Sequence, residues 1–391
     1  MSDVSFMERL LDGVEVEWKP LGEVSRFING RAYKKPELLD QGKYPVLRVG
    51  NFFTNANWYH SDLELEDDKY CDNGDLLYAW SASFGPRIWE GGKVIYHYHI
   101  WKVVPNADLI LKKFLFYLLE WDTKALQGEH ATGSTMMHVT KGAIESRLVP
   151  IPCPNNPKKS LEIQAEIVRI LDAFAAHTAE LTAELNLRKK QYNYYRDQLL
   201  SFEEGDVEWK TLGEFADNLD SKRKPITSGL REAGNIPYYG ASGIVDYVKG
   251  YIFDGDFLLV SEDGANLLAR NTPIAFSISG KTWVNNHAHV LKFDTYAERR
   301  YVEYYLNSID LTPYISGAAQ PKLNKKNLES IRIPNPSPTE KERIVTVLDK
   351  FDALTSSITE GLPREIELRQ KQYEFYRDLL LSFPKPEEVE T

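Results

Sequence analysis

The chain contains an internal duplication: four sequence blocks of its first half recur in the same order in its second half. The matching pairs are "VEWKPLGE" at 16–23 with "VEWKTLGE" at 207–214, "IESRLVPIP" at 144–152 with "LESIRIPNP" at 328–336, "EIVRILDAF" at 166–174 with "RIVTVLDKF" at 343–351, and "LRKKQYNYYRDQLLSF" at 187–202 with "LRQKQYEFYRDLLLSF" at 368–383. Such a tandem duplication restricts the fold to two similar modules, each followed by a similar linker.

Each module reads as a mixed α/β domain, predicted over residues 14–158 and 205–338. Short β-rich runs such as "GDLLYAW" and "GDFLLVS" alternate with turn residues in both copies. An aromatic helical stretch follows at 111–120 and at 299–309. The overall prediction is therefore an α+β fold with two tandem modules.

The segments 159–204 and 339–384 are predicted to be long helices that pair as an antiparallel coiled coil. Apolar residues recur along both at alternating spacings of four and three, the pattern of a helix seam. Gly361 and Pro363 should kink the second helix. The residues predicted to form these spacer and subunit-docking helices are Ile167, Leu171, Phe174, Leu181, Leu185, Tyr192, Tyr195, Leu199, Ile344, Leu348, Phe351, Ile358, Tyr373, Tyr376 and Leu380.

The N-terminal segment 1–13 resembles the end of a linker helix, because "MERLLDGVEVEW" is similar to "YRDQLLSFEEGDVEW" at 195–209. We expect it to pack beside the C-terminal helix and complete a circular plan around a pseudo-twofold axis. Residues 385–391 are interpreted as a tail.

Composition excludes several classes of protein. Only Cys71 and Cys153 occur, which argues against a disulfide framework or a zinc cluster and fits the cytoplasm. No apolar run is long enough to span a membrane. The net charge of −10 lies mostly in the two helical segments, so the nearly neutral modules remain compatible with nucleic acid.

Signatures of catalysis are missing from the sequence. It contains neither a phosphate-binding Gly-rich loop nor a dinucleotide fingerprint, and "NIPYYG" at 235–240 is interpreted as a strand and turn. His97 with His99, and His287 with His289, occupy matching predicted strands, where each pair would share one face. That arrangement suits a metal site or ordinary hydrogen bonding. No other ligand type recurs beside both pairs, which favours hydrogen bonding, and no metal is predicted.

Basic, polar and aromatic residues cluster in loops at matching places of the two modules, "NGRAYKKPE" with "DSKRKPITSG" and "GSTMMHVTKG" with "GAAQPKLNKK". Such residues suit DNA phosphates and base edges. The predicted DNA-binding residues are Arg31, Tyr33, Lys34, Lys35, Ser83, Arg87, Ser134, Thr135, Lys141, Lys222, Arg223, Lys224, Tyr238, Gln320 and Lys322.

Taken in order, the repeated blocks resemble the specificity (S) subunits of type I restriction–modification enzymes, and the tetrads "TAELTAEL" at 178–185 resemble those of the IC branch. The resemblance implies that each module is a target recognition domain for one half of a bipartite double-stranded DNA site. It also implies that the helices dock two methyltransferase subunits, which restriction subunits then join. AdoMet, ATP and Mg²⁺ would belong to those partners, and the S subunit would not be an enzyme.

The sequence also admits two other interpretations: an assembly scaffold that does not read DNA, and the specificity half of a fused enzyme. Sequence-dependent DNA binding separates the first from an S subunit. The second is disfavoured because the repeat plan leaves no segment for a catalytic domain.

At the TAEL tetrads, the apolar residues of the first helix are separated by four residues twice in succession, where the spacing otherwise alternates between four and three. Such an interruption of the pattern, called a stutter, results from four inserted residues. Between matched residues, Phe174 to Gln191 is four residues shorter than Phe351 to Gln372. Each tetrad adds ~6 Å of helix against ~3.4 Å per base-pair step. The tetrads are therefore predicted to set the spacing between the two half-sites.

Overall fold

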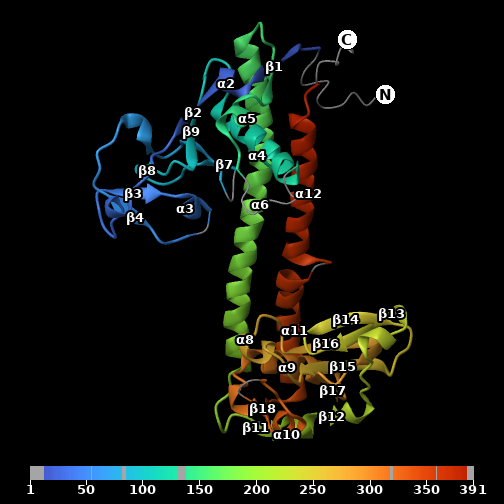
Figure 1. The fold of residues 1–391 in the computed structure, drawn as a ribbon. Helices are drawn as coiled ribbons and strands as arrows, with labels where there is room; N and C mark the ends of the chain where they lie inside the picture. The colour runs from blue at the N-terminus through green and yellow to red at the C-terminus, as the bar shows by residue number, and fades with distance from the viewer. Residues whose placement is uncertain are drawn as a thin grey trace. The chain divides into compact units, whose positions relative to one another are not determined.

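The computed structural model describes residues 13–53, 55–81, 85–129, 138–317, 320–357 and 359–384 (Figure 1). The chain divides into two compact units, and both divisions fall within long helices. Unit 1 comprises Met1–Glu180 and Glu367–Thr391, whereas unit 2 is the continuous segment Leu181–Ile366. Each unit therefore combines one module with parts of both linkers, in keeping with a circular plan.

The first module contains two small sheets and a separate strand pair. One sheet has the order β2 (Ser25–Asn29), β9 (Ile100–Pro105), β6 (Leu76–Ala79) and β7 (Gly85–Ile88), and the other β4 (Tyr59–Ser61), β3 (Tyr44–Leu47), β8 (Val94–Tyr96) and β5 (Tyr70–Cys71). The separate pair is β1 (Val16–Pro20) with β10 (Leu148–Pro152). Most neighbours are antiparallel, but β3 and β8 run parallel.

The second module repeats this topology in one continuous sheet. Its strand order is β12 (Asp217–Asn218), β17 (Ala288–Lys292), β15 (Phe253–Ser261), β16 (Ala275–Val284), β13 (Ala233–Gly240) and β14 (Gly243–Val248), and β11 (Glu208–Thr211) pairs with β18 (Arg332–Asn335). The long strand β16 pairs antiparallel with β15 and then parallel with β13. In the first module β7 and β8 divide these two roles, which leaves two sheets instead of one.

Most helices occur at matching places in the two copies. The α-helices are α2 (Leu21–Val24), α3 (Val49–Phe53), α4 (Lys112–Glu129), α5 (Lys141–Glu145), α6 (Pro157–Leu200), α7 (Leu212–Phe215), α8 (Asn266–Ala269), α9 (Tyr296–Ser308), α10 (Lys325–Glu329), α11 (Pro338–Ser356) and α12 (Gly361–Leu381). The 3₁₀ turns are η1 (Lys35–Glu37), η2 (Asp67–Lys69), η3 (Asp220–Lys222), η4 (Ser228–Leu230) and η5 (Thr312–Tyr314). The aromatic stretches expected to be helical are α4 and α9.

The beginnings of the two linkers belong to the module cores, which corrects part of the predicted seam. Ile167 and Leu171 of α6 are buried with α4 in the core of the first module. Ile344 and Leu348 of α11 occupy the same role in the second module. Their spacing of four and three reflects burial in a module core that includes a helix of that module, because an amphipathic stripe does not identify what covers it.

The ends of the linkers also reach a module core. Within unit 1, Leu380 and Leu381 of α12, with Phe383 beyond it, are buried against the first module. Trp18 of β1 donates its indole N–H to the carbonyl of Pro384 at 2.8 Å. The predicted packing of segment 1–13 against the C-terminal helix concerns residues that, apart from Gly13, lie outside the described part of the chain.

The second linker is broken where Gly361 and Pro363 predicted a kink. α11 ends at Ser356 and α12 begins at Gly361, whose φ of +75° lies in the left-handed region. A Cβ there would lie 2.3 Å from the carbonyl oxygen of Ala353, so the break requires glycine. By contrast α6 is continuous through the TAEL tetrads, where Leu181 and Leu185 are half-buried. Within the described ranges no helix combines the length and apolar character needed to cross a membrane.

Candidate nucleic-acid interface

Four segments that are distant in sequence meet at one edge of the first module. Residues 30–35 hydrogen-bond to the turn at 97–99, since Tyr98 donates its backbone N–H to the carbonyl of Arg31 at 3.1 Å. Val139 donates to the carbonyl of Trp80 at 3.0 Å, which joins segment 138–141 to residues 80–81. We call these four segments the first loop face.

The second module brings the matching four segments together. Leu219 donates its backbone N–H to the carbonyl of Val290 at 2.8 Å, and Leu323 donates to that of Glu262 at 2.8 Å. Glu262 in turn donates to the carbonyl of His287 at 2.8 Å. Segments 219–224, 261–263, 285–289 and the described residues of 316–324, which are 316–317 and 320–324, form what we call the second loop face. The paired basic loops are therefore parts of one surface in each module.

Most of the predicted DNA-binding lysines are exposed on these faces. Lys34, Lys35 and Lys141 lie on the first face, and Lys222, Lys224, Gln320 and Lys322 lie on the second. Lys322 also pairs with Glu262 at 3.0 Å while half of its side chain remains exposed. Arg87 lies on β7, where its guanidinium contacts the ring and carbonyl of Phe52.

Two of the predicted DNA contacts are instead internal. Tyr238 is only 1% exposed, and its phenol oxygen accepts the backbone N–H of Ile226 at 2.9 Å. Arg223 is also largely buried, with a guanidinium nitrogen 2.6 Å from a carboxylate oxygen of Glu262. Residue type alone suggested DNA contacts here, but burial assigns these side chains to the structure of the module.

Arg31 and Tyr33 are partly engaged within the first loop face. The Arg31 guanidinium makes two hydrogen bonds to Glu37, at 2.9 and 2.8 Å, and holds the pKa of that carboxyl at about 2. Tyr33 stacks on His97, and burial raises the pKa of its phenol. Ser83, Ser134 and Thr135 lie outside the described residues, as does Ile358 of the predicted helix seam.

The histidine pair of the first module lies between two strands, with His97 in an isolated β-bridge to Arg31 and His99 in a turn, which corrects the predicted strand placement. His97 and His99 flank Tyr98 between β8 and β9, and the His99 ring packs with those of His97 and Trp80, while Trp80 packs with His138. Burial, then the proximity of His99 and Arg48, lowers the pKa of His97 to about 4, so its imidazole is neutral at pH 7. The repeated His-x-His motif was the only sequence signal for this cluster.

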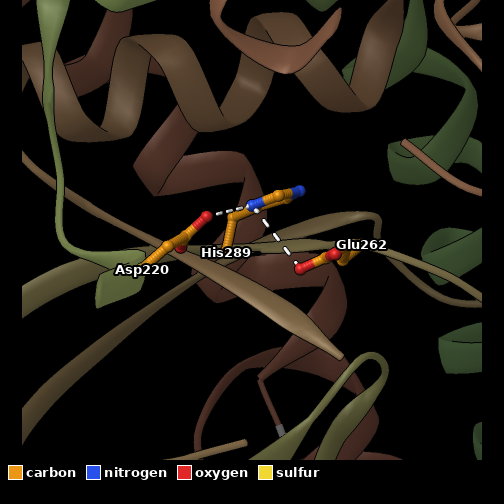
Figure 2. Close-up of side chains that lie close together, drawn as sticks. All are labelled: Asp220, Glu262 and His289. Carbon is orange, nitrogen blue, oxygen red and sulfur yellow. Dashed lines mark hydrogen bonds and ion pairs between the residues drawn. The ribbon is translucent and has the colours of Figure 1, made fainter. Parts of the chain in front are cut away.

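In the second module His289 lies on β17 within a charged cluster (Figure 2). Its Nδ1 lies 2.6 Å from Asp220 and 3.9 Å from Glu262, and its Nε2 lies 2.7 Å from the carbonyl of Leu323. Burial alone would raise the pKa of both carboxyls. The hydrogen bonds from His289 to Asp220, and from Arg223 and Lys322 to Glu262, outweigh this effect, so both pKa values are lowered.

Asp220, Glu262 and His289 offer ligand atoms within 4.8 Å of one another, which also suits a metal ion. The Arg223 guanidinium, however, already contacts both carboxylates, at 3.3 Å from Asp220 and 2.6 Å from Glu262. Because the Arg223 and Lys322 cations already pair with these two carboxylates, we interpret the cluster as an ionic network and not as a metal centre.

Comparison with known proteins identifies the family. The family description "Type I restriction modification DNA specificity domain" matches residues 13–188 and 204–368. The chain is 40% identical to the EcoR124I/EcoR124II specificity subunit of Escherichia coli, over the whole of both chains. It is 36% identical to the EcoprrI specificity subunit of the same species, covering 92% of this chain and 93% of the relative.

Solved structures show the same fold at low identity. An S subunit from M. genitalium aligns with a TM-score of 0.60 at 16% identity, covering 96% of this chain and 98% of its own. A chain from a study of type I restriction–modification complex assembly aligns with a TM-score of 0.56 at 16% identity, covering 94% and 97%. The two matched domains, the full-length similarity to named relatives and the duplicated fold together place this chain in the family of type I restriction–modification specificity subunits.

Proposed function

We propose that each module reads one half of a bipartite double-stranded DNA site through its loop face, while the linker helices set the spacing between the halves. The observation that carries this proposal is the repeated convergence of the same four segments. The backbone arrangement is shared, and each face exposes lysines suited to phosphates. The other side chains differ between the faces, as expected if each face reads a different sequence.

The helices are proposed to dock two methyltransferase subunits, one for each unit. Tyr194 in unit 2 and Phe375 in unit 1 are matched by the repeat and are 62% and 64% exposed. Leu187 and Leu368 lie one heptad before them, are also exposed, and extend the same helix faces. Large apolar side chains in a contiguous exposed stripe mark interaction surfaces. Two copies of this stripe would bind two identical partners.

Restriction subunits would join this assembly, which would act on DNA in the cytoplasm. AdoMet, ATP and Mg²⁺ would be bound by the partner subunits. The chain itself would direct adenine methylation or cleavage to a sequence without catalysing either.

The test uses the complete complex with its methyltransferase subunits. Sequencing of methylated adenines in cellular DNA should reveal one asymmetric motif in two parts. Replacing Lys34 and Lys35 by serine should weaken binding to all sequences and reduce the slope of log affinity against log salt by roughly one per lost phosphate contact. Lys249→Ser, at the opposite edge of the second module's sheet, is the control and should leave the slope unchanged.

A scaffold that does not read DNA would give a different result. Binding that ignores sequence, and that survives loss of both the Lys34–Lys35 and Lys222–Lys224 clusters, would contradict the proposed function.

A further inference from the structure

The charged cluster of the second module is fully paired. His289 has no exposed surface, and its two ring nitrogens face a carboxylate oxygen of Asp220 and the carbonyl oxygen of Leu323. Both of these partners are acceptors, so each ring nitrogen lies where an N–H group would donate. Arg223 supplies a buried cation, and its pairing with the carboxylates of Asp220 and Glu262 is what makes these buried charges tolerable.

Members of this network come from separate segments of the second loop face. Asp220 and Arg223 belong to segment 219–224, Glu262 follows β15, and His289 lies on β17. The Asp220 carboxylate also accepts the backbone N–H of Val290 at 3.0 Å, and Arg223 donates to the carbonyl of Ala288 at 2.8 Å. Segment 219–224 is thereby fixed to the sheet at several points.

The same network holds segment 316–324. Lys322 pairs with Glu262, and the carbonyl of Leu323 accepts the Nε2 proton of His289. Because Arg223 points inward, the lysines on either side of it, Lys222 and Lys224, remain exposed. The network therefore fixes the backbone of both segments that present cations and amides on this face.

The first module has no corresponding charge network among its described residues. Equivalent backbone hydrogen bonds in the two modules show that Trp80 occupies the position of Glu262, and that His138 occupies the position of Lys322. The same hydrogen bonds and strand registers match His287 with His99, and His289 with Trp101, whose ring stacks on that of Trp80 at 5.8 Å between centroids. Burial and the neighbouring His138 lower the pKa of His99, which favours a neutral ring. The second module thus stabilises its loops with ion pairs, and the first module stabilises its loops with packed aromatic and imidazole rings.

We propose that Asp220, Arg223, Glu262 and His289 are positioning residues for DNA reading by the second module alone. They act through the exposed residues of segments 219–224 and 316–324, and they determine how sharply the second half-site is distinguished. The inference rests on the proposed function.

The experiment compares Glu262→Gln with the wild-type chain, each in the complete complex with methyltransferase subunits. Glutamine keeps the shape of the side chain and removes the charge that faces Arg223 and Lys322. Discrimination at the second half-site should fall on the order of tenfold, the scale of a lost base contact. The sequence of the first half-site and the spacer should not change. Because Glu262 is not a phosphate contact, the salt slope of binding should also stay constant.

Glu232→Gln is the matched control, because Glu232 pairs with Lys249 on the surface and both side chains are 77% exposed. It removes the same charge from the same module and should leave the methylated motif unchanged. Hydrogen exchange supplies a second readout: in Glu262→Gln, segments 219–224 and 316–324 should exchange faster while β15 and β17 stay protected.

If β15 and β17 lose protection, Glu262→Gln has unfolded the module and Glu262→Asp replaces it. Aspartate keeps the charge and shortens the side chain, which weakens the pairing with Arg223 and Lys322, and the same relaxation of the second half-site is expected. A motif and an exchange pattern identical to wild type in the folded variant would overturn the inference. Absence of sequence-dependent binding by the wild-type complex would instead contradict the proposed function.

Discussion

The ring of Tyr376 in α12 stacks on that of Phe174 in α6, with centroids 5.1 Å apart and an interplanar angle of 18°. In the other unit Tyr195 stacks on Phe351 at 5.8 Å and 27°. The repeat matches Phe174 with Phe351 and Tyr195 with Tyr376, so one helix–helix contact is made twice. Each unit thus has its own copy of the contact between the two linkers.

Phe174→Ala should destabilise unit 1 by about 1–3 kcal/mol, because a half-buried ring and its stacking partner are lost. The expected result is faster hydrogen exchange in β1 and β10, with no change in β11 and β18. Phe351→Ala should give the reverse pattern. Equal effects of either change on both strand pairs would show that the two contacts are not separate.

Gly361→Ala should destabilise the start of α12 by roughly 1–3 kcal/mol, since alanine strains the left-handed backbone and its Cβ meets the carbonyl of Ala353. Thermal unfolding of the complex measures the loss. Gly142→Ala in α5 is the control, because no atom lies within 4 Å of the added Cβ. A stability equal to wild type in Gly361→Ala would show that the break adjusts freely.

Tyr194→Ser and Phe375→Ser should each weaken the binding of one methyltransferase subunit on the order of tenfold, as expected for an exposed aromatic anchor. Native mass spectrometry should then show complexes with one such subunit for each single variant and none for the double variant. Lys189→Ser, on another face of α6, should leave two subunits bound. Full occupancy in the double variant would place the docking surface elsewhere.

A third TAEL tetrad inserted after Leu185 should lengthen the spacer between half-sites by one or two base pairs, from ~6 Å of added helix and ~3.4 Å per step. Sequencing of methylated adenines reports the motif directly. Both half-site sequences should be unchanged. A fixed spacer, or a change in either half-site, would reject a ruler function for the tetrads.

Acid should weaken the first module before it affects the charge network of the second. The pKa of His97 is about 4 in the folded chain against its ordinary 6.5. As pH falls from 6.5 to 4, His97 therefore binds a proton in the unfolded chain but stays largely neutral in the folded chain. Stability is complete above pH 6.5 and falls through this window by on the order of 1–2 kcal/mol, allowing for partial exposure.

His97→Gln should flatten that pH dependence in chemical denaturation of the complex. The carboxyls of Asp220 and Glu262 have lowered pKa values, so their contribution is complete above their ordinary values of 3.8 and 4.5 and is lost only in stronger acid. A slope between pH 6.5 and 4 that persists in His97→Gln would assign it to another group.

The duplication made the fold predictable because the repeated blocks are the parts that the two modules share physically. Trp18 and Trp209 lie in matching strand pairs, and matching helix ends enter matching cores. Spacing alone could not say what each apolar stripe packs against, so Ile167 and Ile344 were assigned to a coiled coil and not to a module. The break at Gly361 was predictable because it depends on local backbone geometry.

The loop faces were predictable only as positions. Lys34 and Lys222 lie on the expected surfaces because basic loops at matching places stay exposed. The internal role of Arg223 depends on Glu262 and His289, which are 39 and 66 positions further along the chain. No local pattern distinguishes a buried arginine from its exposed neighbours. Tyr238 was misassigned for the same reason, because its buried partner is contributed by the backbone of a different segment.

The discontinuity of unit 1 has a consequence for synthesis. The core of the first module includes Leu380, Leu381 and Phe383, near the end of the chain, whereas unit 2 is one uninterrupted segment. Because chains emerge from the ribosome N-terminus first, the first module is synthesised before the second but can complete its core only after residues 380–383 have been made. A premature stop codon after Ile366 would therefore remove core residues of the first module and leave the segment that forms unit 2 intact.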